Sequence, residues 1–280
     1  VKARAAVFDD GEASVALIGL DVLVVGAETV RRIREAAERK TAGRVKAGDI
    51  LIAASHTHSS GPLCGYRPAE LAEAPPLIRK LALECSINIE PDYEQLVVER
   101  ASDAVYLAGQ RMEAVSFCAG SGSDGSAVFN RRIRMKDGRA LTHPGKGNPE
   151  IVGPAGPIDS EVGVIGGWRE DGTLAGCVVN YACHGTTWGG TVSADWIGAL
   201  DKTIRAVYGA DAVVVFLNGA AGDITQVDNI GLRQARPNKD NLEIIGTRVG
   251  AEAVKVLVSA ERGAMAPVRS ISQTLTLPRR

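Results

Sequence analysis

Two stretches of this chain follow the same plan, in which a β-hairpin is followed by a helix and then by one more strand. The hairpin turns are predicted at Asp9-Asp10-Gly11 and Glu170-Asp171-Gly172, because Asp-Gly between β-rich runs is typical of tight turns. In the first stretch we expect a strand over residues 13–20, a helix over about 27–39 and a strand that ends at His56. In the second we expect strands over 162–168 and 174–182, a helix over about 194–207 and a strand that ends at Asn218.

This repeat limits the architectures that are possible. The two turns are 161 residues apart, which is longer than the period of solenoid repeats, so the chain is not predicted to be a repeat array. Alternating strands and helices favour an α/β fold of layered, mixed β-sheets flanked by helices. We therefore predict a single domain over residues 1–280, in which residues 1–62 and 158–228 form two pseudo-repeated halves around a central cleft.

The remaining segments are predicted to complete this domain. Helical patterns over 69–83 and 92–115 are expected to cover a sheet, and the Gly/Ser-rich run 118–126 is expected to be a loop. The apolar stripe over 242–259 predicts a helix that packs on the core, and residues 270–277 are expected to form a strand that leaves the domain.

Composition excludes several classes of protein. The 280 residues are 45% hydrophobic and 23% charged, which suits a packed domain, and the net charge of −1 gives no reason to expect binding to nucleic acid. No apolar run approaches the roughly 20 residues of a membrane-spanning helix. Five cysteines without paired spacing favour free thiols. We expect a soluble protein of undetermined oligomeric state, with the cytoplasm favoured and secretion possible if a signal peptide has been removed.

Half of the four histidines lie in one short segment, His56-Thr57-His58, directly after an apolar strand. Alternate residues of a strand point to the same side, so His56 and His58 are expected to face one site. Two further strand ends support a site here, because His184 follows the apolar run 178–183, and Asn218 ends a strand that leads to Asp223 and Thr225. Imidazole, amide and carboxylate groups are thus predicted to converge.

Several of these residues also have simpler explanations. Asp195 precedes a predicted helix, so helix capping explains it as well as substrate contact does. Asp223 can anchor its own turn, although its place after a buried strand favours a functional role. Cys183 is interpreted as a buried structural thiol and not a nucleophile, and His143, in a turn-rich segment, as a solvated side chain.

Motifs in a fixed order along the chain resemble the amino-terminal catalytic domain of the neutral, non-lysosomal ceramidases. These motifs are Ser55-His56-Thr57-His58 with Gly61-Pro62, Asn130-Arg131, Ile158-Asp159, the strand ending at His184, Ser193-Ala194-Asp195, and Gly222-Asp223-Ile224-Thr225. The resemblance implies a zinc-dependent amidase in which His56 and His184 are metal ligands. It also implies that His58 and Arg131 line the reacting centre.

The chain departs from the family pattern in two respects. Thr225 stands where the family has a serine, and a threonine hydroxyl can still act as a nucleophile or hydrogen-bond donor. The family's remaining zinc ligands, a glutamate and a tyrosine, would lie beyond Arg280, so the chain resembles one piece of a longer protein, incomplete at both ends. Within these residues, a third ligand is expected from Asp195 or Asp223.

The predicted function is therefore hydrolysis of an amide bond in an N-acyl lipid, with a sphingolipid as the first candidate. His58, Asp223, Thr225 and Arg131 are the predicted catalytic residues, and Asn218, Asp195 and Asn130 the predicted substrate contacts. In this hypothesis His58 or Asp223 transfers the proton, and Arg131 or Asn218 stabilises the oxyanion. A related hydrolase acting on a carbohydrate derivative is the alternative, because Trp188 and Trp196 flank the motifs. A degenerate, non-catalytic binding domain is the second alternative.

Overall fold

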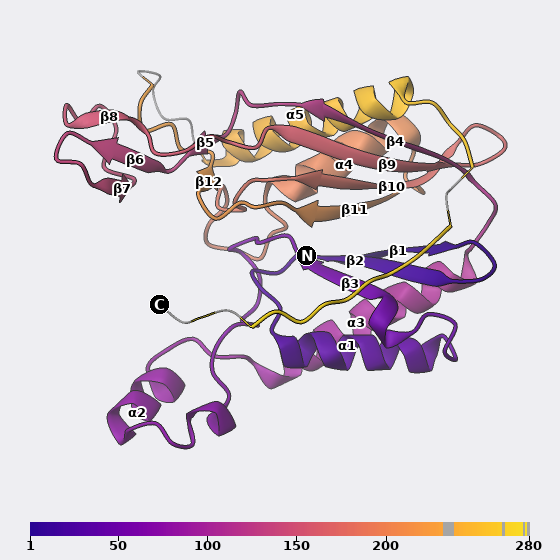
Figure 1. Ribbon diagram of the computed structural model, residues 1–280, viewed down its shortest axis with the longest axis horizontal. Helices are drawn as coiled ribbons and strands as arrows, with labels where there is room; N and C mark the ends of the chain where they lie inside the picture. Colours follow the sequence, from indigo (N-terminus) through magenta and orange to yellow (C-terminus); the bar gives the residue numbers. More distant parts are fainter. Residues whose placement is uncertain (232–237, 265–266, 277, 279–280) are drawn as a thin grey trace.

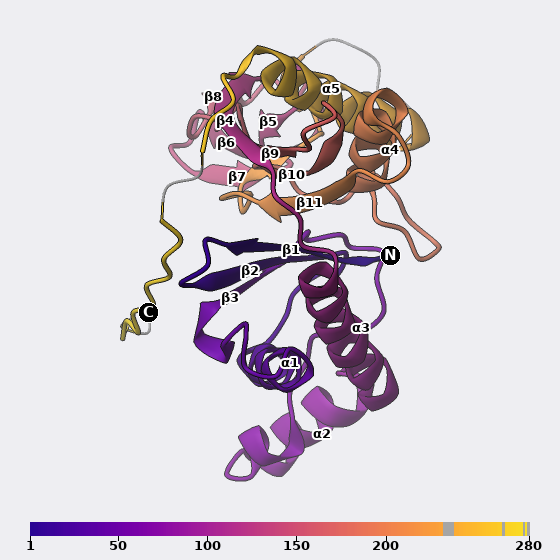
Figure 2. The ribbon, with the colours of Figure 1, turned by 90° about the vertical axis from the view of Figure 1, so that its right-hand side faces the viewer.

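The computed structural model describes residues 1–231, 238–264, 267–276 and 278. Four layers are seen edge-on, in the order helix, sheet, sheet, helix (Figures 1 and 2). The first sheet contains β1 (Ala3–Asp9), β2 (Ser14–Leu20) and β3 (Ile50–Ala54) in that order, with β1 and β2 antiparallel and β2 and β3 parallel. Helices α1 (Ala27–Lys40) and α3 (Pro91–Gln110) cover its outer face. The predicted layered α/β fold is confirmed.

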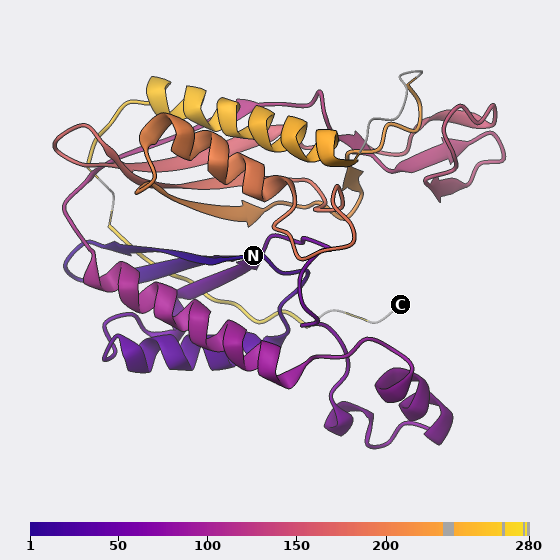
Figure 3. The same ribbon diagram turned by 180° about the vertical axis from the view of Figure 1, so that it is seen from behind.

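The second sheet has the strand order β11-β10-β9-β4. Its strands are β4 (Ser116–Ser123), β9 (Glu161–Trp168), β10 (Leu174–Tyr181) and β11 (Val213–Asn218), and α4 (Trp196–Tyr208) and α5 (Asn238–Ser259) lie above it (Figure 3). The β9–β10 hairpin is antiparallel and β11 adds in parallel to β10, as β3 adds to β2. The same plan is thus followed by both stretches.

The two sheets pack face to face, with β11 lying over the first sheet. Their backbones approach closely at Gly19, where a Cβ atom would lie only 2.7 Å from the carbonyl oxygen of Phe216. At one edge, Arg4 pairs with Asp21 of its own half at 3.3 Å and with Asp201 of α4 at 3.2 Å. Gly19 therefore permits the two sheets to approach closely, where a larger side chain would separate them. The Arg4–Asp201 ion pair joins the two halves at the edge.

Each half has its own hydrophobic core, as its residue spacing predicts. In α4 the buried residues Ile197, Leu200 and Ile204 recur every three to four positions, and with Trp196 they form the face of the helix that enters the upper core. In the lower half, Ala16 and Ile18 of β2 alternate toward Ile33 and Ala37 of α1. The helix predicted over 242–259 begins at Asn238 and contributes Val249 to the upper core.

The loop predicted over 118–126 was wrong, because Ser116–Ser123 forms the edge strand β4, paired with β9 along its whole length. Small residues occur here because α5 packs directly on this strand. A Cβ atom on Gly120 would lie 3.2 Å from Val256, and one on Gly122 would overlap Glu252. The predicted helix 92–115 accordingly ends earlier, at Gln110.

Two peripheral predictions were also wrong. Helix α2 (Pro76–Glu84), which follows the turn η2 (Pro68–Leu71), does not cover the sheet: its residues are all exposed or partly exposed, and it lies apart from the layers (Figure 1). The described residues 270–276 form no strand, and Ile271 is 97% exposed, so no sheet edge pairs with this segment; Leu277 lies outside the described residues.

Two small sheets extend from the end of the upper layer. Strands β6 (Arg132–Met135), β7 (Ala140–Thr142) and β8 (Ile151–Pro154) form an arm, and β5 (Phe129–Asn130) pairs with β12 (Ile224–Thr225) at its base. The turn η1 (Ala47–Asp49) precedes β3. Among the helices that the structure describes, none is both long and apolar enough to cross a membrane.

Candidate metal centre

The first histidine of the candidate site is held by a sharp change in backbone direction. Strand β3 ends at Ala54, and His56 has a φ of 64°, a left-handed conformation that is rare for a residue with a Cβ atom. Its peptide N–H donates to the Val22 carbonyl at 3.0 Å, and its Nδ1 lies 2.8 Å from the Leu23 carbonyl oxygen. The ring is therefore oriented by the segment that leaves β2, with Nδ1 as donor and Nε2 facing the site.

The histidine from the second half is held in the same way. His184 is buried, and its peptide N–H donates to the Ile224 carbonyl at 3.1 Å. Its Nδ1 lies 2.6 Å from the carbonyl oxygen of Ala221. In a neutral ring whose Nδ1 donates to a carbonyl, Nε2 is unprotonated, which is the form that binds a metal ion.

The three rings of His56, His58 and His184 meet at one point. A nitrogen of each lies within 4.8 Å of the other two, and the Nε2 atoms of His56 and His58 are 3.4 Å apart. Zinc–nitrogen bonds of about 2.0–2.1 Å in a tetrahedron separate two ligand nitrogens by about 3.4 Å, so the spacing fits one shared ion. Strand alternation was not the reason for this convergence, because His56 and His58 follow the strand in a turn.

His58 differs from the other two in its surroundings. It is exposed, and its Nε2 lies beside Nε2 of His56. In the described part of the chain no carbonyl orients the His58 ring, whereas a backbone carbonyl orients each of His56 and His184. Metal-ligating histidines nearly always have such an orienting partner. The geometry therefore suits His56 and His184 as ligands, with His58 beside them.

Backbone pairing joins the two segments that contain these histidines. Thr57 and Gly185 form a parallel bridge, and the His58 peptide N–H donates to the Gly185 carbonyl at 2.9 Å. A Cβ atom on Gly185 would lie 2.9 Å from the Thr57 Cα atom, so only glycine permits this approach. On the other side, the Thr57 hydroxyl donates to the Ser193 carbonyl at 2.9 Å.

The electrostatics disfavour the charged forms of His58 and His184. Although the His58 side chain is exposed, its contacts with the protein remove part of its hydration and lower its pKa below the ordinary value of 6.5; His56 and, to a smaller extent, Arg131 lower this pKa further, whereas Asp195 raises it. Burial likewise lowers the pKa of His184, and Arg131 again adds to the effect. The charge of Arg131 therefore acts on both rings.

The predicted residues Asn130, Arg131 and Asp223 form one hydrogen-bonded unit where β5 meets β12. Asn130 Nδ2 donates to the Asp223 carboxylate at 2.7 Å and to the Pro157 carbonyl at 3.0 Å. The Arg131 peptide N–H donates to the Asp223 carbonyl at 2.7 Å. These contacts hold the backbone of Arg131 beside the loop that orients His184.

The carboxylate of Asp195 accepts hydrogen bonds from three groups of the protein. It caps α4 through the Trp196 N–H at 2.8 Å, and it also accepts from the Trp188 N–H at 2.8 Å and the Thr187 hydroxyl. Capping, one of the two explanations for this residue, accounts for the first of these contacts. Among the described residues, the group that could hold a metal ion contains His56, His58 and His184 and does not include Asp195.

Thr225, Asn218 and His143 were also singled out in the sequence. Thr225 is buried in β12, next to the Ile224 carbonyl that holds His184, and its hydroxyl donates to the Gln226 side chain at 3.2 Å. Asn218 contacts the backbone carbonyls of the residues that precede both ligand candidates. His143 is exposed, as predicted, and contacts Asn229 at 3.2 Å.

The five cysteines are free, as predicted. Burial raises the pKa of the Cys183 thiol, so its nucleophilic thiolate is disfavoured and the structural interpretation holds. Of the two tryptophans considered for a sugar cleft, Trp196 is fully buried and donates from Nε1 to the His184 carbonyl at 3.0 Å. It cannot serve as an exposed stacking platform, whereas Trp188 is partly exposed.

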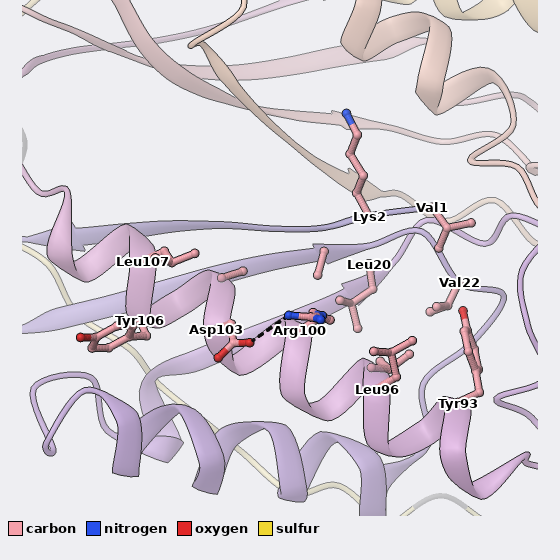
Figure 4. A pocket seen from close by; sticks show the side chains of 13 residues that line it. Val1, Lys2, Leu20, Val22, Tyr93, Leu96, Arg100, Asp103, Tyr106 and Leu107 are labelled. Carbon is pink, nitrogen blue, oxygen red and sulfur yellow. Dashed lines mark ion pairs between the residues drawn. The ribbon is translucent and has the colours of Figure 1, made fainter.

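The structure also has an apolar cavity of about 700 Å³ between α3 and the first sheet (Figure 4). Its lining includes Leu20, Val22, Tyr93, Leu96 and Leu107. The three histidines are not among the lining residues, so the chemistry and the cavity lie in different places. Only the Val22 end approaches the site, since the Val22 carbonyl accepts from His56.

Sequence reasoning missed the groups that orient the rings. They are the backbone carbonyls of Leu23 and Ala221, and Gly185, which allows the two segments to pair. Carbonyl groups leave no trace in residue identity. The His184-Gly185 pair was a visible signal, since glycine beside a candidate ligand is typical of close backbone approach.

No family model and no curated protein sequence matches the chain. Solved structures do. Neutral ceramidase from Pseudomonas aeruginosa superposes with a TM-score of 0.70 at 21% identity, over 92% of this chain and 39% of that one. The fold is that of a neutral ceramidase. A ceramidase complexed with C2 superposes with a TM-score of 0.72 at 20% identity, over 92% of this chain and 38% of the ceramidase chain.

The chain therefore spans less than two fifths of either ceramidase. The histidines and their neighbours lie within the part of the fold that is shared with these ceramidases. At this level of sequence identity the comparison concerns the fold alone.

Proposed function

We propose that this protein is a zinc-dependent hydrolase of the ceramidase type, which cleaves the amide bond of an N-acyl lipid. The orientation of His56 and His184 supports this most directly. Each ring donates from Nδ1 to a backbone carbonyl, at 2.8 Å and 2.6 Å, and presents Nε2 to the same point. Imidazole nitrogens oriented in this way are a donor set that zinc prefers.

The residues around that point suit amide hydrolysis. Zinc bound there would polarise the substrate carbonyl and acidify a water molecule. His58, whose pKa is lowered, is neutral near pH 7 and would accept a proton at Nε2. Arg131 would stabilise negative charge that develops on the carbonyl oxygen, and Asn130 and Asp223 would hold its backbone in place.

Thr225 and Asp223 have narrower roles in this proposal. Thr225 would supply a hydroxyl at the position where the ceramidases have a serine, and its location beside the Ile224 carbonyl keeps it near His184. Asp223 would act chiefly through Asn130 and Arg131, because its carboxylate accepts from Asn130 at 2.7 Å. Proton transfer is therefore assigned to His58.

The substrate class follows from the fold shared with neutral ceramidase and from the motifs that resemble that family. An amide with one acyl chain is the common element of such substrates. The alternative of a carbohydrate derivative has lost one of its two supporting tryptophans, because Trp196 is buried in the core.

The test is hydrolysis of fluorogenic N-acyl amides by protein stripped of metal with a chelator and then reloaded with zinc. We expect activity with zinc, little without it, and a dependence of kcat/KM on acyl-chain length. Activity that survives complete removal of metal would contradict the metal-dependent mechanism. Cleavage of N-acetylated sugars in preference to N-acyl lipids would contradict the proposed substrate class.

A further inference from the structure

Asn218, the last residue of β11, lies between the two strand ends that lead to His56 and His184. Its Nδ2 donates to the Ser55 carbonyl at 2.9 Å and to the Cys183 carbonyl at 3.2 Å. Its Oδ1 accepts from the Cys183 peptide N–H at 3.4 Å. One carboxamide thus contacts the backbone of both halves of the molecule.

The two contacted residues are the immediate neighbours of the candidate ligands. Ser55 precedes His56 and Cys183 precedes His184, so the carboxamide joins two peptide units that are each one residue from an imidazole. Ser55 and Cys183 are 1% and 0% exposed, so the two accepting carbonyls are shielded from water, while Asn218 itself is half-buried.

These contacts change the role expected for Asn218. Both hydrogens of its Nδ2 are engaged by backbone carbonyls, which leaves no donor for a substrate oxyanion. We propose that Asn218 is a positioning residue that sets the separation of His56 and His184. This inference rests on the proposed function, in which these two histidines hold zinc.

The physical reason is the narrow range of zinc–ligand distances. A zinc–nitrogen bond is about 2.0–2.1 Å long, so ligands that follow strands of two different sheets must be held to within a few tenths of an ångström. The Thr57–Gly185 bridge joins the segments on one side of the rings, and Asn218 joins them before the rings. Together, these contacts hold the backbone on both sides of His56 and of His184.

The neighbouring strand offers a matched control. Asn180 of β10 also donates from Nδ2 to a backbone carbonyl, that of Leu217 at 2.8 Å, but this contact lies within one sheet and its side chain is exposed. Replacing Asn180 removes an asparagine-to-backbone hydrogen bond without touching the junction between the halves.

The experiment compares zinc affinity in the unaltered protein and in Asn218→Ala, Asn218→Asp and Asn180→Ala, by competition with a chromophoric chelator. Visible spectra of the cobalt(II)-loaded proteins and melting temperatures of the metal-free proteins are measured alongside. We expect roughly tenfold or greater loss of zinc affinity and altered cobalt bands in both Asn218 variants, as for other residues that orient ligands. Asn180→Ala should bind zinc within about twofold of the unaltered protein.

The outcomes separate this inference from the proposed function. Failure of the unaltered protein to bind zinc would overturn both. Zinc bound equally well by the unaltered protein and by folded Asn218 variants would overturn only the positioning role. Unfolding of both Asn218 variants while Asn180→Ala stays folded would make Asn218 a general stability residue and would also overturn the specific role.

Discussion

The peptide N–H of His58 donates a 2.9 Å hydrogen bond to the carbonyl of Gly185, the residue that follows His184. The histidine pair of the first half is thereby tied to the histidine of the second half. The candidate centre consequently exists only when the two sheets are packed, and metal binding should report on the assembly of both halves.

Substitution of Gly185 should disturb this junction. In Gly185→Ala the new Cβ atom would lie 2.9 Å from Thr57 Cα and 3.0 Å from the His56 carbonyl oxygen, so the two backbones must move apart. We expect a loss of about 1–3 kcal/mol in the free energy of unfolding, measured by urea denaturation, together with weaker zinc binding. Gly189→Ala is the control, because a Cβ atom there has no neighbour within 4 Å. Equal stability of the two variants would argue against the close approach.

Removal of either proposed ligand should abolish metal binding. His56→Ala and His184→Ala each leave one carbonyl-oriented imidazole, and we expect elemental analysis to show less than one tenth of the zinc bound by the unaltered protein. His143→Ala tests specificity, since His143 is exposed and lies outside the three-histidine group. If His143→Ala lost zinc to the same extent, the assignment of these ligands would be wrong.

Substitution of His58 should reduce catalysis without removing the metal ion. In the described part of the chain no carbonyl orients the His58 ring, so we expect His58→Ala to keep stoichiometric zinc. The kcat for N-acyl amide hydrolysis should fall by about 10²–10⁴, because the variant lacks the proposed proton acceptor. Zinc content and kcat are measured on the same preparation. Loss of zinc in this variant would instead identify His58 as the third ligand, which its 3.4 Å distance from His56 also permits geometrically.

Acid should destabilise the metal-free protein through the same rings. The folded-state pKa values of His58 and His184 are lowered, so the unfolded chain binds more protons than the folded one as the pH falls below about 6.5. Stability should therefore be greatest above that pH and decline on acidification toward the folded-state values. Melting temperatures between pH 7.5 and 5.5 test this, and a double His58→Gln/His184→Gln variant should show a shallower decline. An unchanged slope would contradict the assignment.

Asp195 should prove to be a structural residue. Its carboxylate caps α4 and accepts from Trp188 and Thr187, so Asp195→Ala should cost about 1–2 kcal/mol of stability by thermal or urea unfolding. Asp195→Asn should recover part of that loss because the amide oxygen still accepts. A large increase in KM without any loss of stability would show that substrate contact, the other explanation for this residue, is the correct one.

Local patterns predicted the elements well. The Asp-Gly turns and apolar runs located both hairpins, and the spacing of apolar residues located α1, α3, α4 and α5 to within a few residues. They failed at β4, where glycine and serine serve the packing of α5 and not a loop, and at α2, whose apolar residues do not enter the layers. At β4 the deciding contact is with α5, more than a hundred residues away, and at α2 none of the helix residues is buried. Periodicity contains no information about which other element, if any, an apolar face packs against.

By itself, the sequence determined which chemical groups stand at the strand ends: the imidazoles of His56, His58 and His184, and the carboxamide of Asn218. Residue type and its place after an apolar run are local properties, so they can be recognised without a structure. How those groups are used depends on the three-dimensional fold. The left-handed turn at His56 and the carbonyls that orient the two rings arise from loops within each half, whereas the contact of Asn218 with both halves arises when the two sheets pack face to face. Backbone carbonyls are common to every residue, and the Asn218–Ser55 contact joins positions 163 residues apart, so local patterns in the sequence cannot identify either.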